Sequence, residues 1–175
     1  TRAEDSAEQV SAALPEGSPA PPLPDPPVAK GGHFHVKYDS KQTHILIGLP
    51  SLARHDPDEA ALVLANEVLG GSGLTSLLGE EVRNKRGLAY SVGSGFQPMR
   101  AEGPFIISLQ TRNDAAGEAL GVVLDTLKRY AQQGPAPAQL EDSRRQLIGN
   151  YPMQFAGNGA IVGTLGMMAF YDLPD

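Results

Sequence analysis

Apolar and polar positions alternate at residues 33–38 and 88–96, a period of two that is typical of half-buried β-strands, and residues 43–50, with a denser apolar run, and 104–111 also indicate strands. In the first of them, Phe34, Val36 and Tyr38 share one side, and histidines and a lysine occupy the other. The last two segments are separated by a short turn-rich stretch, which favours a hairpin. We predict strands at residues 33–38, 43–50, 88–96 and 104–111.

Apolar positions recur at a spacing of three and four in the segments between and after these strands, which predicts helices. The first has clear boundary signals: Asp56 can cap it, Pro57 suits its first turn, and Gly70 can end it in a left-handed conformation. Pro152 should kink or break the helix that Pro137 opens. We predict helices at residues 56–70, 72–87, 114–132, 137–151 and 159–170.

The order of elements is strand, strand, helix, helix, strand, strand, helix, helix, helix. Runs of strands followed by runs of helices indicate an α+β fold, with a mostly antiparallel sheet backed by helices on one face. The strands and helices do not alternate one by one, which argues against a doubly wound parallel sheet.

The two ends of the chain bear on its domain organisation. Residues 1–14 have helical composition, and we expect them to be the end of a preceding domain's last helix. Residues 15–32 are rich in proline, which favours an extended backbone, so they predict a semi-rigid linker or an arm on the domain surface. Residues 33–175 form one domain in this interpretation. The chain starts without Met and ends abruptly on FYDLPD, so we expect a piece of a longer protein, truncated at its C-terminus.

Composition narrows the function classes. The 175 residues are 41% hydrophobic and carry a formal net charge of −6, with no basic stripe. A nucleic-acid partner and an anionic membrane surface are therefore poor candidates. No apolar run approaches the roughly 20 residues of a membrane-spanning helix. The absence of cysteine excludes disulfides, thiolate metal sites and cysteine nucleophiles.

The glycine-rich stretch LGGSGLTS, residues 69–76, opens a predicted helix and must be weighed as a phosphate site. A P-loop needs a lysine after the glycines, and none follows here. The glycine spacing also misses the dinucleotide fingerprint. We therefore favour a tight turn between helices, in which glycine can also allow another chain or a ligand to approach closely.

Histidines are the second candidate. His33 and His35 lie two apart on the polar side of a predicted strand, but zinc needs a third protein ligand. His44 and His55 have no neighbours in a metal-binding pattern. Solvent-facing side chains explain the histidines better than a metal site does.

Arg83 and Tyr90 lie on either side of Gly87, where a predicted helix stops and a strand begins. The ordinary interpretation is a helix-surface arginine paired with Glu80 or a later acid, and a strand aromatic that fills the core. The functional alternative is that the chain turns back at Gly87 and brings a guanidinium and a phenol together on a peptide carbonyl. Composition alone favours the ordinary interpretation.

The stretch EVLGGSGLTSLLGEEVRNKRGLAYSVGSGF resembles the second-domain signature of the insulinase, pitrilysin and mitochondrial processing peptidase family of zinc peptidases. The similarity runs from residue 43 through the helix at 114–132. It rests on N-x-x-L-G-G-x-G, S-x-L, E-x-R and R-G-L-A-Y-S-V. These motifs are carried by Asn66, Leu69, Gly70, Gly71, Gly73, Ser76, Leu78, Glu81, Arg83, Arg86, Gly87, Leu88, Ala89, Tyr90, Ser91 and Val92.

The resemblance implies an α/β roll of the LuxS/MPP type, in which a facing domain supplies an Arg/Tyr pair that binds substrate near zinc. That pair matches Arg83 and Tyr90, with Gly70, Gly71, Gly73 and Gly87 as a supporting loop. No H-x-x-E-H occurs in this chain, so the resemblance implies a zinc site elsewhere, either in an upstream domain or in a paralogous subunit of a heterodimer. The chain alone should then be inactive. A periplasmic location would be usual for bacterial members.

Two rival hypotheses belong to other classes. The first is a scaffold without peptidase activity, like the subunits that this fold contributes to respiratory complexes, in which Arg83 and Tyr90 are relics or interface residues. The second is a free-standing small-ligand or nucleic-acid module, whose nucleic-acid form the acidic charge disfavours. An H-x-x-E-H motif upstream or in a neighbouring paralogue would support the peptidase hypothesis.

Overall fold

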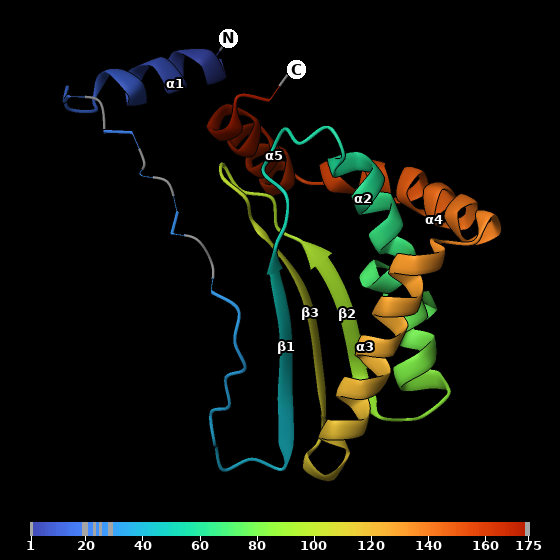
Figure 1. Ribbon diagram of the computed structural model, residues 1–175. Coiled ribbons are helices and arrows are strands. Elements are labelled where there is room, and N and C mark those ends of the chain that lie inside the picture. Colours follow the sequence, from blue (N-terminus) through green and yellow to red (C-terminus); the bar gives the residue numbers. More distant parts are fainter. Residues whose placement is uncertain (1, 19–20, 23, 25, 28–29, 174–175) are drawn as a thin grey trace.

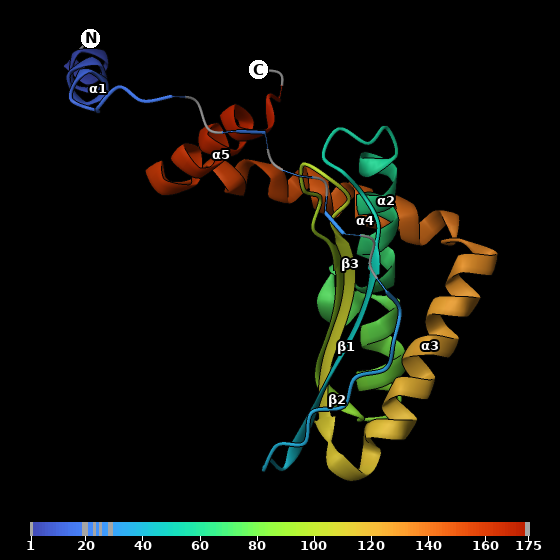
Figure 2. The same cartoon turned by 60° about the vertical axis from the view of Figure 1, so that its left-hand side comes forward.

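The computed structural model describes residues 2–18, 21–22, 24, 26–27 and 30–173. Over these residues it is an α+β fold, as the pattern predicts, with a three-stranded sheet in the order β1-β3-β2. Both strand pairs are antiparallel, and the helices cover one face of the sheet while the other face stays open (Figures 1 and 2). The strands are β1 (Gln42–Pro50), β2 (Ala89–Phe96) and β3 (Pro104–Arg112).

Most predicted helices are present. Pro152 does break the chain's fourth long helix, which ends at Asn150 and gives way to a short 3₁₀ segment. The helical elements are α1 (Arg2–Ala12), α2 (Glu59–Asn66), η1 (Glu67–Gly71), η2 (Gly73–Thr75), η3 (Gly79–Asn84), η4 (Asn113–Ala115), α3 (Ala116–Gln133), α4 (Pro137–Asn150), η5 (Tyr151–Phe155) and α5 (Asn158–Tyr171).

The core lies between the sheet and the helices η1, η3 and α3. Along β3, alternate side chains from Phe105 to Thr111 are buried, and the residues between them are more exposed. Each fully buried aliphatic or aromatic side chain contributes roughly 1.5–3 kcal/mol. The buried cluster comprises Leu69, Leu78, Val82, Leu88, Ala89, Val92, Phe105, Ile107, Leu109, Ala115, Ala119 and Val123.

The first predicted strand, residues 33–38, is wrong. These residues have no regular secondary structure, and Phe34, Val36 and Tyr38 are 84–88% exposed. Alternation specifies a strand only where one face is covered and the backbone is paired. Here β1 pairs with β3, and residues 33–38 are not paired to the other edge of β1 among the described residues.

The N-terminal part stands apart from the sheet. The helix α1 buries none of its residues and lies away from the sheet in both views (Figures 1 and 2). The described residues between 15 and 32 have no regular secondary structure. The assignment of these segments to a preceding domain and a linker remains a prediction.

The second predicted helix, residues 72–87, is interrupted at Ser76. Its backbone is extended, and its Oγ accepts a hydrogen bond from the Gly79 N–H at 3.1 Å, so Ser76 caps the helical turn that follows. The same hydroxyl donates to the Gly73 carbonyl at 2.5 Å. Gly73 has φ = 62° and begins η2 with a left-handed residue just after η1.

Gly70 does not end its helix in a left-handed conformation, because the helix continues through η1 to Gly71. Its role is close packing against β2. A Cβ at Gly70 would lie 2.7 Å from the Ser94 nitrogen and would also meet the Ser94 hydroxyl. Two hydrogen bonds join Asn66 to the same residue: Asn66 Nδ2 to the Ser94 carbonyl at 3.0 Å, and Ser94 Oγ to Asn66 Oδ1 at 2.6 Å.

The turn between η3 and β2 is held by Glu81. Gly87 has φ = 62° and stops the helix, as predicted. The Glu81 carboxylate lies 2.9 Å from Lys85 Nζ and 2.6 Å from Arg86 Nη1, and Arg86 also donates to the Glu81 carbonyl. Hydrogen bonds from Lys85 and then Arg86 lower the pKa of Glu81 below its usual value. The side chain is 14% exposed, so this cluster ties the turn to the helix from a partly covered position.

We predict that Gly70→Ala destabilises the protein by about 1–3 kcal/mol, because the added methyl group has no room beside β2. The free energy of unfolding in urea measures the effect. Gly121→Ala is the control: Gly121 lies in α3 with nothing within 4 Å of a Cβ, so it should be neutral or stabilising by up to about 1 kcal/mol. Equal stability of Gly70→Ala and the wild type would contradict the packing.

A second prediction concerns pH. Because the folded state lowers the pKa of Glu81, its stabilisation is complete above the unfolded value of 4.5 and is lost as the pH falls through the folded value. Glu81→Gln should therefore cost roughly 1 kcal/mol near pH 7 and progressively less below pH 4.5, since its partners are partly exposed.

Unfolding curves of the wild type and Glu81→Gln between pH 3 and 8 would check this difference. Glu102→Gln provides the matched control, because Glu102 is exposed and forms no ion pair with another described residue. A difference between wild type and Glu81→Gln that does not depend on pH would show that the ion pairs are not its cause.

Candidate functional site

An irregularity in β2 determines where Tyr90 lies. Ala89 pairs with Thr111 and Val92 pairs with Leu109, so two residues of β2, Tyr90 and Ser91, oppose the single residue Gln110. Such a β-bulge re-aims side chains. Regular alternation places Tyr90 on the buried side with Val92, and this prediction is wrong: Tyr90 is 82% exposed, whereas Val92 is 7% exposed.

The structure brings Arg83 and Tyr90 together. The guanidinium carbon of Arg83, in η3, lies 4.8 Å from the centroid of the Tyr90 ring. A cation–π contact of this kind contributes about 0.5–1 kcal/mol at an exposed position. The chain does turn back at Gly87, and this turn brings the side chains of Arg83 and Tyr90 into contact.

The polar groups of this pair have no other partner among the described residues. The ordinary interpretation pairs Arg83 with Glu80 or a later acid, but Glu80 accepts from Asn84 at 2.8 Å and lies 4.0 Å from Lys85, and Arg83 forms no ion pair with a described residue. Neither the Arg83 guanidinium nor the Tyr90 hydroxyl makes a side-chain hydrogen bond within the described part of the chain. A guanidinium carries five N–H donors and a phenol one, so the pair presents donors that are free to bind an acceptor from outside.

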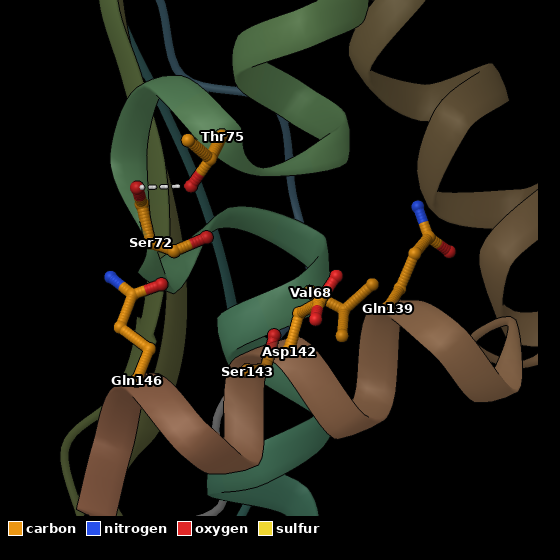
Figure 3. A pocket seen from close by; sticks show the side chains of 7 residues that line it. All are labelled: Val68, Ser72, Thr75, Gln139, Asp142, Ser143 and Gln146. Atoms are coloured by element: carbon orange, nitrogen blue, oxygen red, sulfur yellow. Dashed lines mark hydrogen bonds between the residues drawn. The ribbon is translucent and has the colours of Figure 1, made fainter. Parts of the chain in front are cut away.

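The glycine-rich loop that precedes η3 in the chain is held by its own hydrogen bonds. Ser72 Oγ donates to the Glu67 carbonyl at 2.7 Å. Thr75 Oγ1 donates to the Ser72 carbonyl at 3.2 Å (Figure 3). A Cβ at Gly71 would lie 2.7 Å from Glu67 Oε1, so this glycine also makes room for packing. Burial raises the pKa of the Glu67 carboxyl above its usual value. The tight-turn interpretation of the loop is confirmed.

A polar hollow of about 290 Å³ separates this loop from α4 (Figure 3). Ser72 and Thr75 line it from the loop, and Gln139, Asp142 and Gln146 line it from α4. Asp142 is paired with Arg145 at 2.8 Å. Neither Arg83 nor Tyr90 lines the hollow, so it is not part of their site.

The residues that could bind a metal are scattered. His33 and His35 are exposed in the segment that is not a strand, and His44 lies on β1. His55 Nε2 lies 2.6 Å from the carbonyl oxygen of Tyr171 at the end of α5. In the part of the chain that the structure describes, no three residues of the types His, Cys, Asp and Glu are grouped so that they could hold a metal ion.

Sequence reasoning did not find the bulge, because Leu88, Tyr90 and Val92 alternate as in a regular strand. In the structure the buried positions of β2 are instead Ala89 and Val92, and Phe96 further on is partly buried. The spacing of three between Ala89 and Val92 does not fit a period of two. The extra residue is therefore visible in the strand pairing and not in the alternation of residue types.

Comparison with known proteins identifies the family and the fold of the chain. Residues 1–147 match the family described as Peptidase M16 inactive domain. The crystal structure of a peptidase M16 inactive domain from Pseudomonas fluorescens is 43% identical and has a TM-score of 0.89, covering 99% of this chain and 42% of that one. A protease from Helicobacter pylori has the same fold, with a TM-score of 0.70 and 18% identity over 78% of this chain and 33% of that chain.

Curated relatives of the chain are named as zinc proteases. A Streptomyces coelicolor protein named uncharacterized zinc protease is 33% identical over 127 residues, which are 73% of this chain and 28% of that protein. The Bacillus subtilis protein YmxG, also named uncharacterized zinc protease, is 30% identical over 65% of this chain and 28% of its own length. The chain thus spans less than a third of the length of these relatives.

None of the described helices has the length and apolar character needed to cross a membrane. With the family match extending over most of its residues, this chain belongs to the Peptidase M16 inactive domain family.

Proposed function

We propose that this domain binds the peptide backbone of a substrate at a zinc site carried by another domain or by a paralogous subunit. The observation that carries the proposal is the Arg83–Tyr90 pair, stacked at 4.8 Å on an exposed bulge with its donors free. The names of the relatives support a zinc peptidase as the parent enzyme. The described residues of this chain do not group into a zinc site, and in this proposal the metal lies in the other part of the assembly.

In this proposal the chain contributes hydrogen-bond donors to the reaction. The Arg83 guanidinium and the Tyr90 hydroxyl donate to the carbonyl oxygen of the peptide bond, or of its neighbour, and so fix the substrate. Zinc supplies the activated water from outside this chain. If a donor reaches the scissile carbonyl, its bond becomes stronger as negative charge develops on that oxygen, and the transition state is stabilised more than the substrate.

The proposal also assigns the parts of the chain. Residues 1–14 are the end of a preceding domain, residues 15–32 a linker, and residues 33–175 the domain that carries the pair. The proline-rich composition of the linker segment and the separation of α1 from the sheet support this division. The linker would set the distance between the two domains that enclose the substrate.

We expect Arg83→Ala combined with Tyr90→Phe to lower kcat/KM of the assembled enzyme about 10²–10³-fold, the usual loss when preorganised donors to a reacting oxygen are removed. Steady-state peptide hydrolysis measures it, and a fall in kcat with little change in KM would place the donors on the transition state. Thermal unfolding should change little, because Tyr90 is exposed and the half-buried Arg83 side chain makes no hydrogen bond to another described residue.

Lys128→Ala is the matched control, since Lys128 is an exposed cation on α3, outside the proposed site. It should hydrolyse peptides at the wild-type rate. If the double variant keeps the wild-type kcat/KM, Arg83 and Tyr90 do not handle substrate, and the scaffold hypothesis replaces the proposal.

A further inference from the structure

Next to the bulge, the open face of the sheet contains a second hollow, of about 190 Å³. It crosses all three strands: His44 and Leu46 come from β1, Ser108 and Gln110 from β3, and Ser91 from β2. Ser91 directly follows Tyr90, and Gln110 is the residue that opposes the bulge. The hollow and the Arg83–Tyr90 pair therefore both adjoin the β-bulge of β2.

The polar side chains of this hollow are free to bind a ligand. None of His44, Ser91, Ser108 and Gln110 makes a side-chain hydrogen bond to another residue within the described ranges. The inward face of the sheet differs, because Thr111 there donates to the Leu88 carbonyl at 2.6 Å. Unpaired donors and acceptors thus gather on the face that the helices leave open.

Size and charge limit what the hollow can take. Pockets for cofactors and other small molecules usually measure about 300–1,000 Å³, so 190 Å³ suits a single amino-acid side chain. Its lining contains no Asp, Glu, Lys or Arg, and Leu46, which is 75% exposed, adds an apolar wall. A neutral side chain that can both donate and accept hydrogen bonds, a hydroxyl or a carboxamide, fits this lining best.

The distance between the hollow and Tyr90 limits which residue of a bound substrate can place its side chain in the hollow. Neighbouring strands lie about 4.8 Å apart, so the far wall on β1 is about 10 Å from Ser91. An extended peptide advances about 3.3 Å per residue, and about three residues span that distance. A side chain in the hollow thus belongs to a residue within about three positions of a peptide bond held at Arg83 and Tyr90.

We propose that this hollow is a substrate subsite that selects a hydroxyl or carboxamide side chain at one position close to the bound peptide bond. The proposal rests on the proposed function of Arg83 and Tyr90. It assigns substrate selection to Gln110, Ser91, Ser108 and His44, which touch the side chain of the substrate, whereas Arg83 and Tyr90 touch its backbone. Backbone contacts act on every peptide alike, and side-chain contacts act on one residue type at one position.

The test uses the full protein assembled with its zinc-bearing part. Its substrates are pairs of peptides that are identical except for one residue, which is glutamine in one peptide and norleucine in the other. Different pairs vary different positions, and at one of the positions within about three residues of the cleaved bond the wild type should prefer the glutamine peptide. Gln110→Leu, which keeps the size of the side chain and removes its amide, should lower the glutamine-to-norleucine ratio of kcat/KM at that position about tenfold or more. Ser108→Ala, which changes the packing very little, should lower the same ratio.

Gln146→Leu is the control, because Gln146 lies on α4 in the other hollow, and it should leave every ratio unchanged. The subsite is wrong if the wild type shows no preference at any of these positions, or if Gln110→Leu and Ser108→Ala both keep the wild-type ratios. Arg83→Ala with Tyr90→Phe should lower both members of each pair equally. An unchanged rate in that variant would instead overturn the proposed function, so the two failures are distinguishable.

Discussion

The bulge between Ala89 and Val92 is the constraint on which the candidate site depends. A contact worth about 0.5–1 kcal/mol is too weak to hold Arg83 over Tyr90 by itself. The pair is held by its neighbours in the chain: Val82 is fully buried and Ala89 is 6% exposed. The core therefore fixes the backbone on both sides of the turn, and the extra residue in β2 sends the ring outward. In the proposed function, donors held in this way would lose little freedom when a substrate binds.

The segment before the turn has a packing role. Gly70 lets a helix approach β2 closely, Asn66 fastens that approach with two hydrogen bonds to Ser94, and Ser76 caps the next helical turn. These contacts lie on the covered face of the sheet and determine the position of η3, from which Arg83 projects. The glycine-rich motif, which could be mistaken for a ligand-binding loop, thus has a packing role in the structure. The open face of the sheet carries the unpaired polar groups.

Much of the fold follows from local sequence signals. The helix break at Pro152, the stop at Gly87 and the antiparallel pairing of β2 with β3 depend on residues close to each other in the chain, and periodicity identifies them. The failures have a different origin. Residues 33–38 have a strand pattern but no paired neighbour, and the role of Gly70 depends on Ser94, 24 positions away.

The candidate site shows the same division. The motif resemblance named Arg83 and Tyr90, and the structure places them in contact. Alternation alone puts Tyr90 in the core and so could not predict their positions. The cause is the inserted residue in β2, which reverses the side of the sheet on which every preceding side chain of the strand lies. The hollow lined by His44, Ser91 and Gln110 depends on the pairing of three strands, which no local pattern specifies.

The most direct measurement is a crystal structure of the assembled protein, made inactive at its zinc-bearing part, with a peptide bound. The account predicts a peptide carbonyl oxygen within about 2.7–3.2 Å of a guanidinium nitrogen of Arg83 or of the Tyr90 hydroxyl. A bound peptide that leaves both side chains in contact only with the protein and solvent would contradict it.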